Sequence, residues 1–176
     1  MAYVVFVLEG VFVLALFVVY GTLFLTIFTQ APYVPTRKRE LDRLIRLANF
    51  RPGDRVVDLG SGDGRIVLAA ARAGADAIGV ERQPVLVWIS RWRARRQGLS
   101  ARAIFRTGNM FDEDIREADV VFCYLLPGTM QKLKEKFEHE LKPGARVISN
   151  AFKMQGWTPT TEDRDGLTAP IFAYQR

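Results

Sequence analysis

The segment over residues 56–65, Val-Val-Asp-Leu-Gly-Ser-Gly-Asp-Gly-Arg, constrains the fold more than any other part of the chain. An apolar, β-prone run ends in a glycine-rich turn, and an apolar helical pattern follows directly. Strand, tight turn and helix in this order are typical of α/β sheets in which the turn holds a nucleotide. Glycines let the backbone approach a ligand closely, and the start of the helix offers unpaired N–H groups. The segment therefore predicts a nucleotide-type site in an α/β fold.

Two carboxylates, Asp58 and Asp63, flank the glycines of this turn. A pyrophosphate is the usual ligand of such a turn, and these carboxylates would repel it. S-adenosylmethionine has no phosphate and carries a cationic sulfonium and an ammonium, so the sequence favours it over an NAD-type dinucleotide. Glu81 lies 21 residues after Gly60, at the end of the next predicted strand. That spacing suits a carboxylate that accepts both ribose hydroxyls.

Strand and helix patterns alternate through the rest of the chain. Helices are predicted over residues 39–49, 65–73, 84–97 and 129–141, and strands over 55–59, 77–80, 103–106, 119–126, 145–149 and 171–174. This alternation predicts a Rossmann-like, doubly wound, mostly parallel sheet covered on both faces. Ligands bind at the carboxyl ends of the strands in such folds. The cofactor contacts expected at these ends are Asp58, Gly60, Ser61, Gly62, Gly64, Glu81, Asn109 and Met110.

Two of these strand ends allow two interpretations. Asn109 follows the third strand, where its side chain and the backbone of its neighbours would read the adenine edge, or would only form a turn. Tyr124 ends the fourth strand, where the methyl acceptor would approach, or is a core residue with its hydroxyl at the rim. Tyr124, Asp112 and the region of Asp63 are the candidates for a catalytic base, and none stands out.

The first 36 residues contain no Lys or Arg and a single acid, Glu9. The 18 residues over 11–28 would span about 27 Å as a helix, close to the hydrocarbon thickness of a bilayer. A signal peptide would carry a basic region that is missing here. We therefore expect a single-pass anchor over residues 1–29, a connector over 30–38 and a catalytic domain over 39–176. Arg37-Lys38-Arg39 follow the span, which places that domain in the cytoplasm. Glu9 lies near the outer interface or faces a partner helix.

All 25 basic residues follow Thr36, against 18 of the 19 acids. This balance favours a lipid headgroup surface or nucleic acid as surroundings, or is ordinary solubilising charge. The predicted helix over 84–97 combines Trp88 and Trp92 with four arginines, which suits either an anionic lipid surface or a core stripe, and the helical spacing favours the core. Cys123 and His139 are each the single residue of their type, so we expect no intrachain disulfide, no metal site and no histidine-based triad.

Three short motifs carry a resemblance to a known class. Residues 58–65, 81–84 and the Tyr-Leu-Leu-Pro run over 124–127 resemble class I S-adenosylmethionine-dependent methyltransferases. Within that class, the apolar N-terminal segment, the Pro-Tyr-Val-Pro-Thr run over 32–36 and the late aromatic stretch over 152–159 resemble a narrower family. These are the membrane-anchored protein-lysine methyltransferases that modify the adenine nucleotide translocase and the ATP synthase c-subunit, with their prokaryotic relatives.

The resemblance implies a cofactor, an acceptor and further contacts. It implies S-adenosylmethionine as the methyl donor, a lysine of a membrane protein as the acceptor, a lipid bilayer as a partner, and Tyr33 and Thr36 closing over the cofactor. Methyltransferases of this class often have an acid after the third strand, where this chain has Asn109. An amide can still accept a hydrogen bond from the adenine amine, so the departure bears on substrate choice.

Two other functions stay open from the sequence. The first is methyl transfer to a lipid amine or to RNA, which the basic charge permits. Nucleic acid is the less favoured acceptor, because the chain lacks the Asp/Asn-Pro-Pro-Tyr signature of base methylation at the end of the fourth strand. The second is a membrane-tethered protein that binds S-adenosylmethionine without turning it over.

Overall fold

The computed structural model describes residues 9–21 and 36–176, and the chain divides into two compact units, residues 1–34 and 35–176. Residues 9–21 form a helix. Among the described residues, no helix combines the length and the apolar character needed to cross a bilayer. The remainder of the expected anchor, residues 1–8 and 22–29, lies outside the described residues, as does Tyr33. The anchor therefore stays a prediction.

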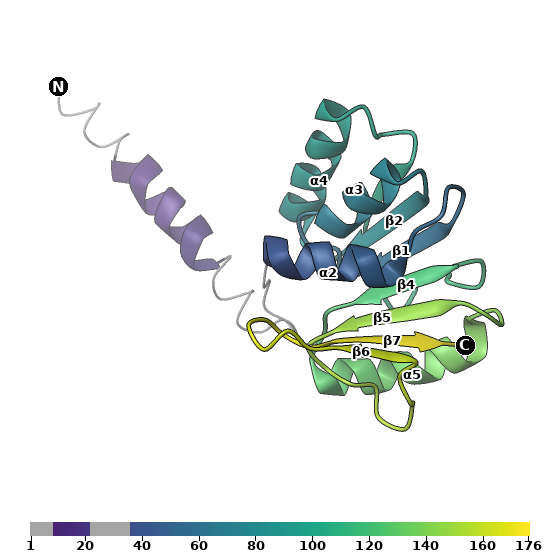
Figure 1. Ribbon diagram of the computed structural model, residues 1–176. Coiled ribbons are helices and arrows are strands. Elements are labelled where there is room, and N and C mark those ends of the chain that lie inside the picture. Colours follow the sequence, from purple (N-terminus) through teal and green to yellow (C-terminus); the bar gives the residue numbers. More distant parts are fainter. Residues whose placement is uncertain (1–8, 22–35) are drawn as a thin grey trace. The chain divides into compact units, whose positions relative to one another are not determined.

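The second unit is a seven-stranded sheet with helices packed against it (Figure 1). Its elements are α2 (Lys38–Ala48), β1 (Arg55–Leu59), α3 (Arg65–Arg72), β2 (Asp76–Glu81), α4 (Pro84–Arg96), β3 (Ala103–Thr107), β4 (Val120–Cys123), α5 (Pro127–Glu140), β5 (Arg146–Asn150), β6 (Thr161–Asp163) and β7 (Ile171–Gln175). The strand order is β3-β2-β1-β4-β5-β7-β6, with β1 to β5 parallel and β7 antiparallel to both neighbours. This confirms the predicted Rossmann-like, mostly parallel fold.

Three details differ from the sequence-based prediction. The fourth strand ends at Cys123 instead of residue 126, because Pro127 opens α5 at a position where proline needs no N–H partner. The sequence pattern places the start of that helix two residues later, at Thr129. The pattern does not predict the short strand β6, since its three residues are polar and mostly exposed and carry no alternating apolar pattern.

One continuous core joins the sheet to the helices α2, α3 and α4. It includes Leu44 of α2, Val67 of α3, Val87 of α4 and, from the sheet, Phe122 and Ile148. The buried side chains of α5 belong to no part of this cluster, and α5 lies apart from the other three helices in Figure 1. The strand order changes direction between β1 and β4, so the carboxyl ends of these two strands mark the expected ligand crevice.

Candidate functional site

The glycine-rich turn after β1 is held in place by its own backbone hydrogen bonds. The glycines at 60, 62 and 64 all have positive φ values, between 53° and 88°, which a side chain would strain. Four N–H groups of the turn already have protein acceptors. These bonds run from Gly60 N (2.9 Å) and Ser61 N (3.0 Å) to Val80 O, from Gly62 N (3.0 Å) to Glu81 Oε2, and from Gly64 N (2.9 Å) to Ser61 O. A phosphate cradle needs such N–H groups free, so this turn is poorly suited to a phosphate.

Close packing against β2 and α4 also holds the glycine-rich turn in place. A Cβ on Gly79 of β2 would lie 2.7 Å from Ser61 Oγ and 2.9 Å from Phe105, so only glycine lets the turn rest on this strand. A Cβ on Gly64 would come within 2.8 Å of both Phe105 and Ser90 Oγ. Ser90, which is fully buried on α4, also donates to the carbonyl of Gly62 at 3.2 Å. The turn is therefore clamped between β2 and α4.

The two carboxylates that flank the glycines have different surroundings. The Asp63 carboxylate pairs with Arg65 at 2.7 Å and with Arg93 of α4. Burial alone would raise the pKa of Asp63, but these two guanidinium groups outweigh it and lower the pKa to about 2. Asp63 is thus compensated within the protein, and the expectation that it helps to repel phosphate is wrong. The occupied N–H groups of the turn provide the better reason.

Asp58, at the same end of β1, has no such compensation. Its side chain is buried, and none of the described residues gives its carboxylate a hydrogen bond or an ion pair. Burial raises the pKa of Asp58 to about 8, with smaller contributions from the charges of Glu81 and Asp63. A buried acid of this kind favours a cationic ligand, because a positive charge nearby would stabilise its ionised form.

Glu81 ends β2 beside the turn, and its carboxylate is oriented by backbone. Oε2 accepts from Gly62 N at 3.0 Å and Oε1 accepts from Gln83 N at 2.9 Å. Each oxygen keeps a second lone pair for a ligand hydroxyl. The next loop is tied to the same strand end, since the N–H of Gly108 donates to the carbonyl of Glu81 at 3.0 Å.

That loop carries three of the residues expected at the site. Asn109 is exposed, and its Oδ1 accepts from Phe111 N at 3.4 Å, which is the turn-forming role that the sequence left open. Met110 is half-buried beside it. Asp112 is exposed, and its N–H donates to the carbonyl of Asn109 at 3.0 Å. The loop thus adjoins Glu81, while no contact among the described residues joins the Asp112 side chain to the glycine turn.

Thr36 connects the turn to the segment that precedes α2. Its side chain is buried, and its carbonyl accepts a hydrogen bond from Arg65, the first residue of α3. Arg65 therefore bonds both Asp63 and Thr36. This contact brings the predicted residue Thr36 to the edge of the glycine turn, because Arg65 lies 29 positions later in the chain and directly follows the turn.

Tyr124 and Asn150 lie at the carboxyl ends of β4 and β5. Tyr124 is half-buried, and its pKa is raised by burial and by the charge of Glu40, so its phenol stays protonated at neutral pH. Asn150 is 2% exposed, and both atoms of its amide lack a hydrogen-bond partner among the described residues. Such orphaned buried groups are rare in folded proteins, and a ligand is one way to satisfy them. Asn150 is absent from the predicted site, although it is a polar residue that follows an apolar strand pattern.

The register places Asn150 and Asp58 on the same face of the sheet. Asp58 pairs with Phe122 of β4, which pairs with Ile148 of β5, two residues before Asn150. Residues two apart in a strand share a face, so Asp58 and Asn150 both face the core that holds Phe122. They lie two strands apart and two residues apart along the strand direction, or about 12 Å between their Cα atoms. Between them lies the crevice where the strand order reverses.

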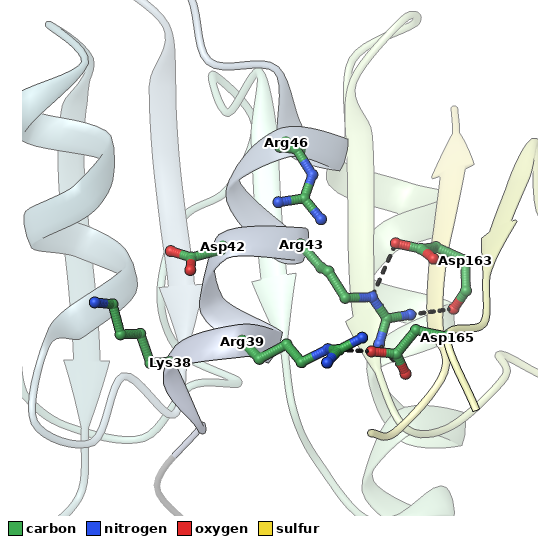
Figure 2. Close-up of a pocket in the computed structure, with 7 residues that line it drawn as sticks. All are labelled: Lys38, Arg39, Asp42, Arg43, Arg46, Asp163 and Asp165. Atoms are coloured by element: carbon green, nitrogen blue, oxygen red, sulfur yellow. Dashed lines mark hydrogen bonds and ion pairs between the residues drawn. The ribbon is translucent and has the colours of Figure 1, made fainter. Parts of the chain in front are cut away.

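A charged cavity of about 460 Å³ lies at α2, and Figure 2 shows the side chains around it. Arg43, only 3% exposed, donates to Asp163 Oδ2 at 3.0 Å and to the Asp163 carbonyl at 2.7 Å, and it approaches Asp165 at 3.1 Å. Arg39 pairs with Asp165 at the exposed rim of the same cavity. The charged side chains around the cavity therefore largely neutralise one another, and Arg43 joins α2 to the β6–β7 hairpin.

These features fit S-adenosylmethionine better than a metal or a dinucleotide. Within residues 9–21 and 36–176, no group of three or more His, Cys, Asp or Glu side chains is arranged to hold a metal ion. The carboxylates of Asp58 and Glu81 suit a cation and a pair of hydroxyls, and the amides of the turn are occupied. Cys123 is buried with its pKa raised to about 12 by burial, so it is no nucleophile at neutral pH.

The chain is similar in sequence to several proteins that are named as lysine methyltransferases. It is 39% identical over 143 residues to the ATP synthase c-subunit lysine N-methyltransferase of Rattus norvegicus, a match that covers 81% of this chain and 65% of that protein. It is 41% identical over 132 residues to a protein-lysine N-methyltransferase of Saccharolobus islandicus, covering 74% and 82%. The chain spans 57–65% of the length of the three mammalian c-subunit methyltransferases that it matches.

A solved structure and a family model also match this chain. The crystal structure of an RNA methyltransferase from Salinibacter ruber, in complex with S-adenosyl-L-homocysteine, matches with a TM-score of 0.76 and 40% identity, covering 81% of this chain and 93% of that one. The model of the ANTKMT methyltransferase domain matches residues 58–161, from the carboxylate before the glycine turn to the first residue of β6. The chain belongs to the ANTKMT methyltransferase domain family.

Proposed function

We propose that this protein transfers a methyl group from S-adenosylmethionine to the side-chain amine of a lysine in a membrane protein. The observation that carries the proposal is the identity of about 40% to lysine N-methyltransferases over the part of the chain that holds the glycine turn. Two of the relatives are named for membrane-protein targets, the ATP synthase c-subunit and the adenine nucleotide translocase.

In this proposal the residues around the turn hold the cofactor. Glu81 would accept hydrogen bonds from the two ribose hydroxyls, and Asp58 would face the cationic end of the molecule. Thr36, and Tyr33 from outside the described residues, would close over it. The bound cofactor supplies a methyl carbon that its sulfonium already activates for in-line displacement by an amine. The protein's own contribution is then alignment and the exclusion of water.

The acceptor amine would approach from the ends of β4 and β5. A lysine amine has an ordinary pKa of about 10.4 and must lose a proton before its lone pair can attack. The side-chain oxygen of Asn150, Oδ1, would accept a hydrogen bond from the neutral amine, which would give this buried atom a partner. Tyr124 would assist as a hydrogen-bonding phenol and not as a base, because its pKa is raised. The proposal assigns no dedicated base, and Asp112 is a weaker candidate because its side chain is exposed.

We further propose that residues 1–29 anchor the protein and that the catalytic unit faces the cytoplasm. The support is the absence of Lys and Arg before residue 37, followed at once by three basic residues. An anchor would confine the search for targets to two dimensions and present the site to lysines at headgroup level.

Incubating the full chain with membranes of its source organism and radiolabelled S-adenosylmethionine tests the acceptor. Label should enter a protein band and be recovered as methyl-lysine after hydrolysis. RNA is the second candidate, because the Salinibacter ruber relative is named an RNA methyltransferase. Label in RNA or lipid would therefore show a different methyl acceptor and refute the proposal, and cofactor binding without label would indicate a non-catalytic binding protein.

Removing residues 1–29 tests the anchor. The shortened chain should bind cofactor normally and label membrane targets more slowly, and labelling at the full rate would refute the anchor.

The raised pKa of Asp58 predicts proton release when the cofactor binds. With a pKa of about 8, Asp58 is mostly protonated at pH 7, and a bound cation would favour its ionised form. Calorimetric titration with S-adenosylmethionine at pH 7, in buffers of different ionisation enthalpy, should report about one proton released. The Asp58→Asn variant should release none, and equal enthalpies in all buffers with the unmodified protein would contradict the assignment.

The raised pKa of Asp58 also affects the free energy of unfolding, with the opposite pH dependence to that of an ordinary paired acid. The contribution of Asp58 to stability is full below about pH 4 and declines as the pH rises through about 8.

A further inference from the structure

The outer face of α4 exposes large apolar side chains. Val85, Trp88 and Trp92 are 66%, 67% and 46% exposed, and their spacing of three and four residues places them on one face of the helix. The helix packs on the sheet through the smaller residues Val87 and Ala94 instead. The two tryptophans are therefore not part of the core, contrary to the interpretation that their spacing favoured. Exposed aromatic side chains in a row mark a contact surface.

The same region carries an excess of positive charge. Residues 82–111 contain no Asp or Glu and seven arginines. Three of these pair with carboxylates elsewhere, namely Arg93 with Asp63, Arg102 with Asp76 and Arg106 with Glu113. The other four form no ion pair with any described carboxylate: Arg82, Arg91, Arg95 and Arg96. Of these, Arg91 donates to the carbonyl of Phe105 at 2.6 Å. The partner of this surface should therefore be anionic.

We propose that this α4 face, made of Val85, Trp88 and Trp92 with the flanking arginines, docks on an anionic lipid bilayer. A helix with aromatic and aliphatic residues on one side and arginines beside them lies in the plane of the interface. Tryptophan rings settle at the headgroup level, and each arginine near an anionic surface adds attraction. The proposal is independent of the methyl acceptor, because it concerns a surface outside the glycine turn.

Lipid fits this surface better than RNA does. The guanidinium of Arg96 lies 5.0 Å from the centroid of the Trp92 ring, so one face of this ring is covered where a base would stack. Val85 has no π-system and is as exposed as Trp88, which suits an apolar phase. A lipid surface uses all three side chains together.

Docking through α4 would also set the height of the glycine turn above the bilayer. Ser90 and Arg93 of α4 bond the backbone of the turn at Gly62 and Asp63. The helix is thus attached to the turn on its inner face while its outer face is free to contact lipid. A membrane-bound α4 would hold the cofactor site at a fixed distance from the headgroups.

Single-tryptophan variants of the full chain test this proposal, because the chain has three tryptophans and none in its first 36 residues. Trp92→Phe with Trp157→Phe leaves Trp88 as the reporter, and Trp88→Phe with Trp92→Phe leaves Trp157 as the control. Trp157 donates to Glu138 and packs on Tyr174, away from α4. Both proteins are reconstituted in vesicles that contain a brominated lipid, made of phosphatidylcholine alone or with phosphatidylglycerol. With residues 1–29 as the proposed anchor, the protein stays bound to both kinds of vesicle. The two lipid compositions are then compared only by how strongly they quench the reporter tryptophan.

Brominated lipid should quench Trp88 strongly in the vesicles with phosphatidylglycerol and weakly in phosphatidylcholine alone, with Trp157 unaffected in both. Arg95→Gln with Arg96→Gln should reduce the ratio of docked to undocked protein about 30-fold, and added salt should act the same way. Equal quenching of Trp88 in both lipids, or none in either, would overturn the proposal. It would also fall if a single-stranded RNA oligonucleotide quenched Trp88 while vesicles did not, or if a second copy of the chain buried it.

Discussion

Replacing Glu81 with alanine should lower the affinity for S-adenosylmethionine by about 10²- to 10⁴-fold. In the proposed complex, the Glu81 carboxylate accepts two hydrogen bonds from the ribose, and bonds to a charged group contribute about 1.5–3 kcal/mol each. The carboxylate also orients the N–H groups of Gly62 and Gln83, at 3.0 and 2.9 Å, so its removal loosens the turn as well. Calorimetric titration of the purified protein measures the effect.

Asp76→Ala is the matched control for Glu81→Ala. Asp76 lies at the amino end of the same strand, β2, whereas Glu81 lies at its carboxyl end. Asp76 pairs with Arg102 at 2.9 Å in an exposed position. Its loss should leave cofactor affinity unchanged within about two-fold, because an exposed ion pair contributes little. Equal effects of the two substitutions, with both proteins folded by circular dichroism, would remove Glu81 from the site.

Arg43→Met should destabilise the protein by about 3 kcal/mol, which lowers the midpoint of thermal unfolding by about 6–12 °C. The Arg43 side chain is 3% exposed and bonds Asp163, Thr168 and the carbonyl of Ala169, as Figure 2 shows in part. Methionine fills a similar volume but leaves these partly buried acceptors without a donor. Thermal unfolding followed by circular dichroism in detergent solution measures the loss.

The neighbouring Arg39→Met provides the control for this prediction. Arg39 pairs with Asp165 at 2.8 Å, but its side chain is 59% exposed, so the loss should be below about 1 kcal/mol. If both substitutions lowered the midpoint equally, the buried network around Arg43 would not be what holds the β6–β7 hairpin to α2.

Most of the fold could be predicted from the sequence because its signals are local. Apolar runs between glycines and prolines located β1, β2, β3 and β5 to within a residue or two, and Pro84 and Gly98 bracketed α4. The misplaced end of β4 has the same origin. The apolar character of the chain continues past Cys123 through Leu126, so the pattern alone does not show that β4 ends before the helix that Pro127 opens.

Parts of the site escaped prediction because they depend on distant partners. The position of Asp63 beside the glycines was plain, but its neutralisation involves Arg93, which lies 30 residues further on, on another helix. The tryptophans of α4 failed in a similar way. Their spacing showed that they share a face of the helix, but which face meets the sheet depends on where Val87 and Ala94 pack. A periodic sequence pattern shows which residues share a face of a helix, but it does not show whether that face packs on the sheet or faces solvent.

The closed hydrogen bonding of the glycine turn has a consequence for recognition. Because β2 and Glu81 already engage several of its amides, the turn keeps its shape before any ligand arrives. Association then requires little ordering of this loop, so more of the contact energy is expressed as affinity. In the proposed complex, the methyl donor and its demethylated product would contact the same backbone of the turn, and the charge of the buried Asp58 would distinguish the cationic sulfonium of the donor from the neutral sulfur of the product.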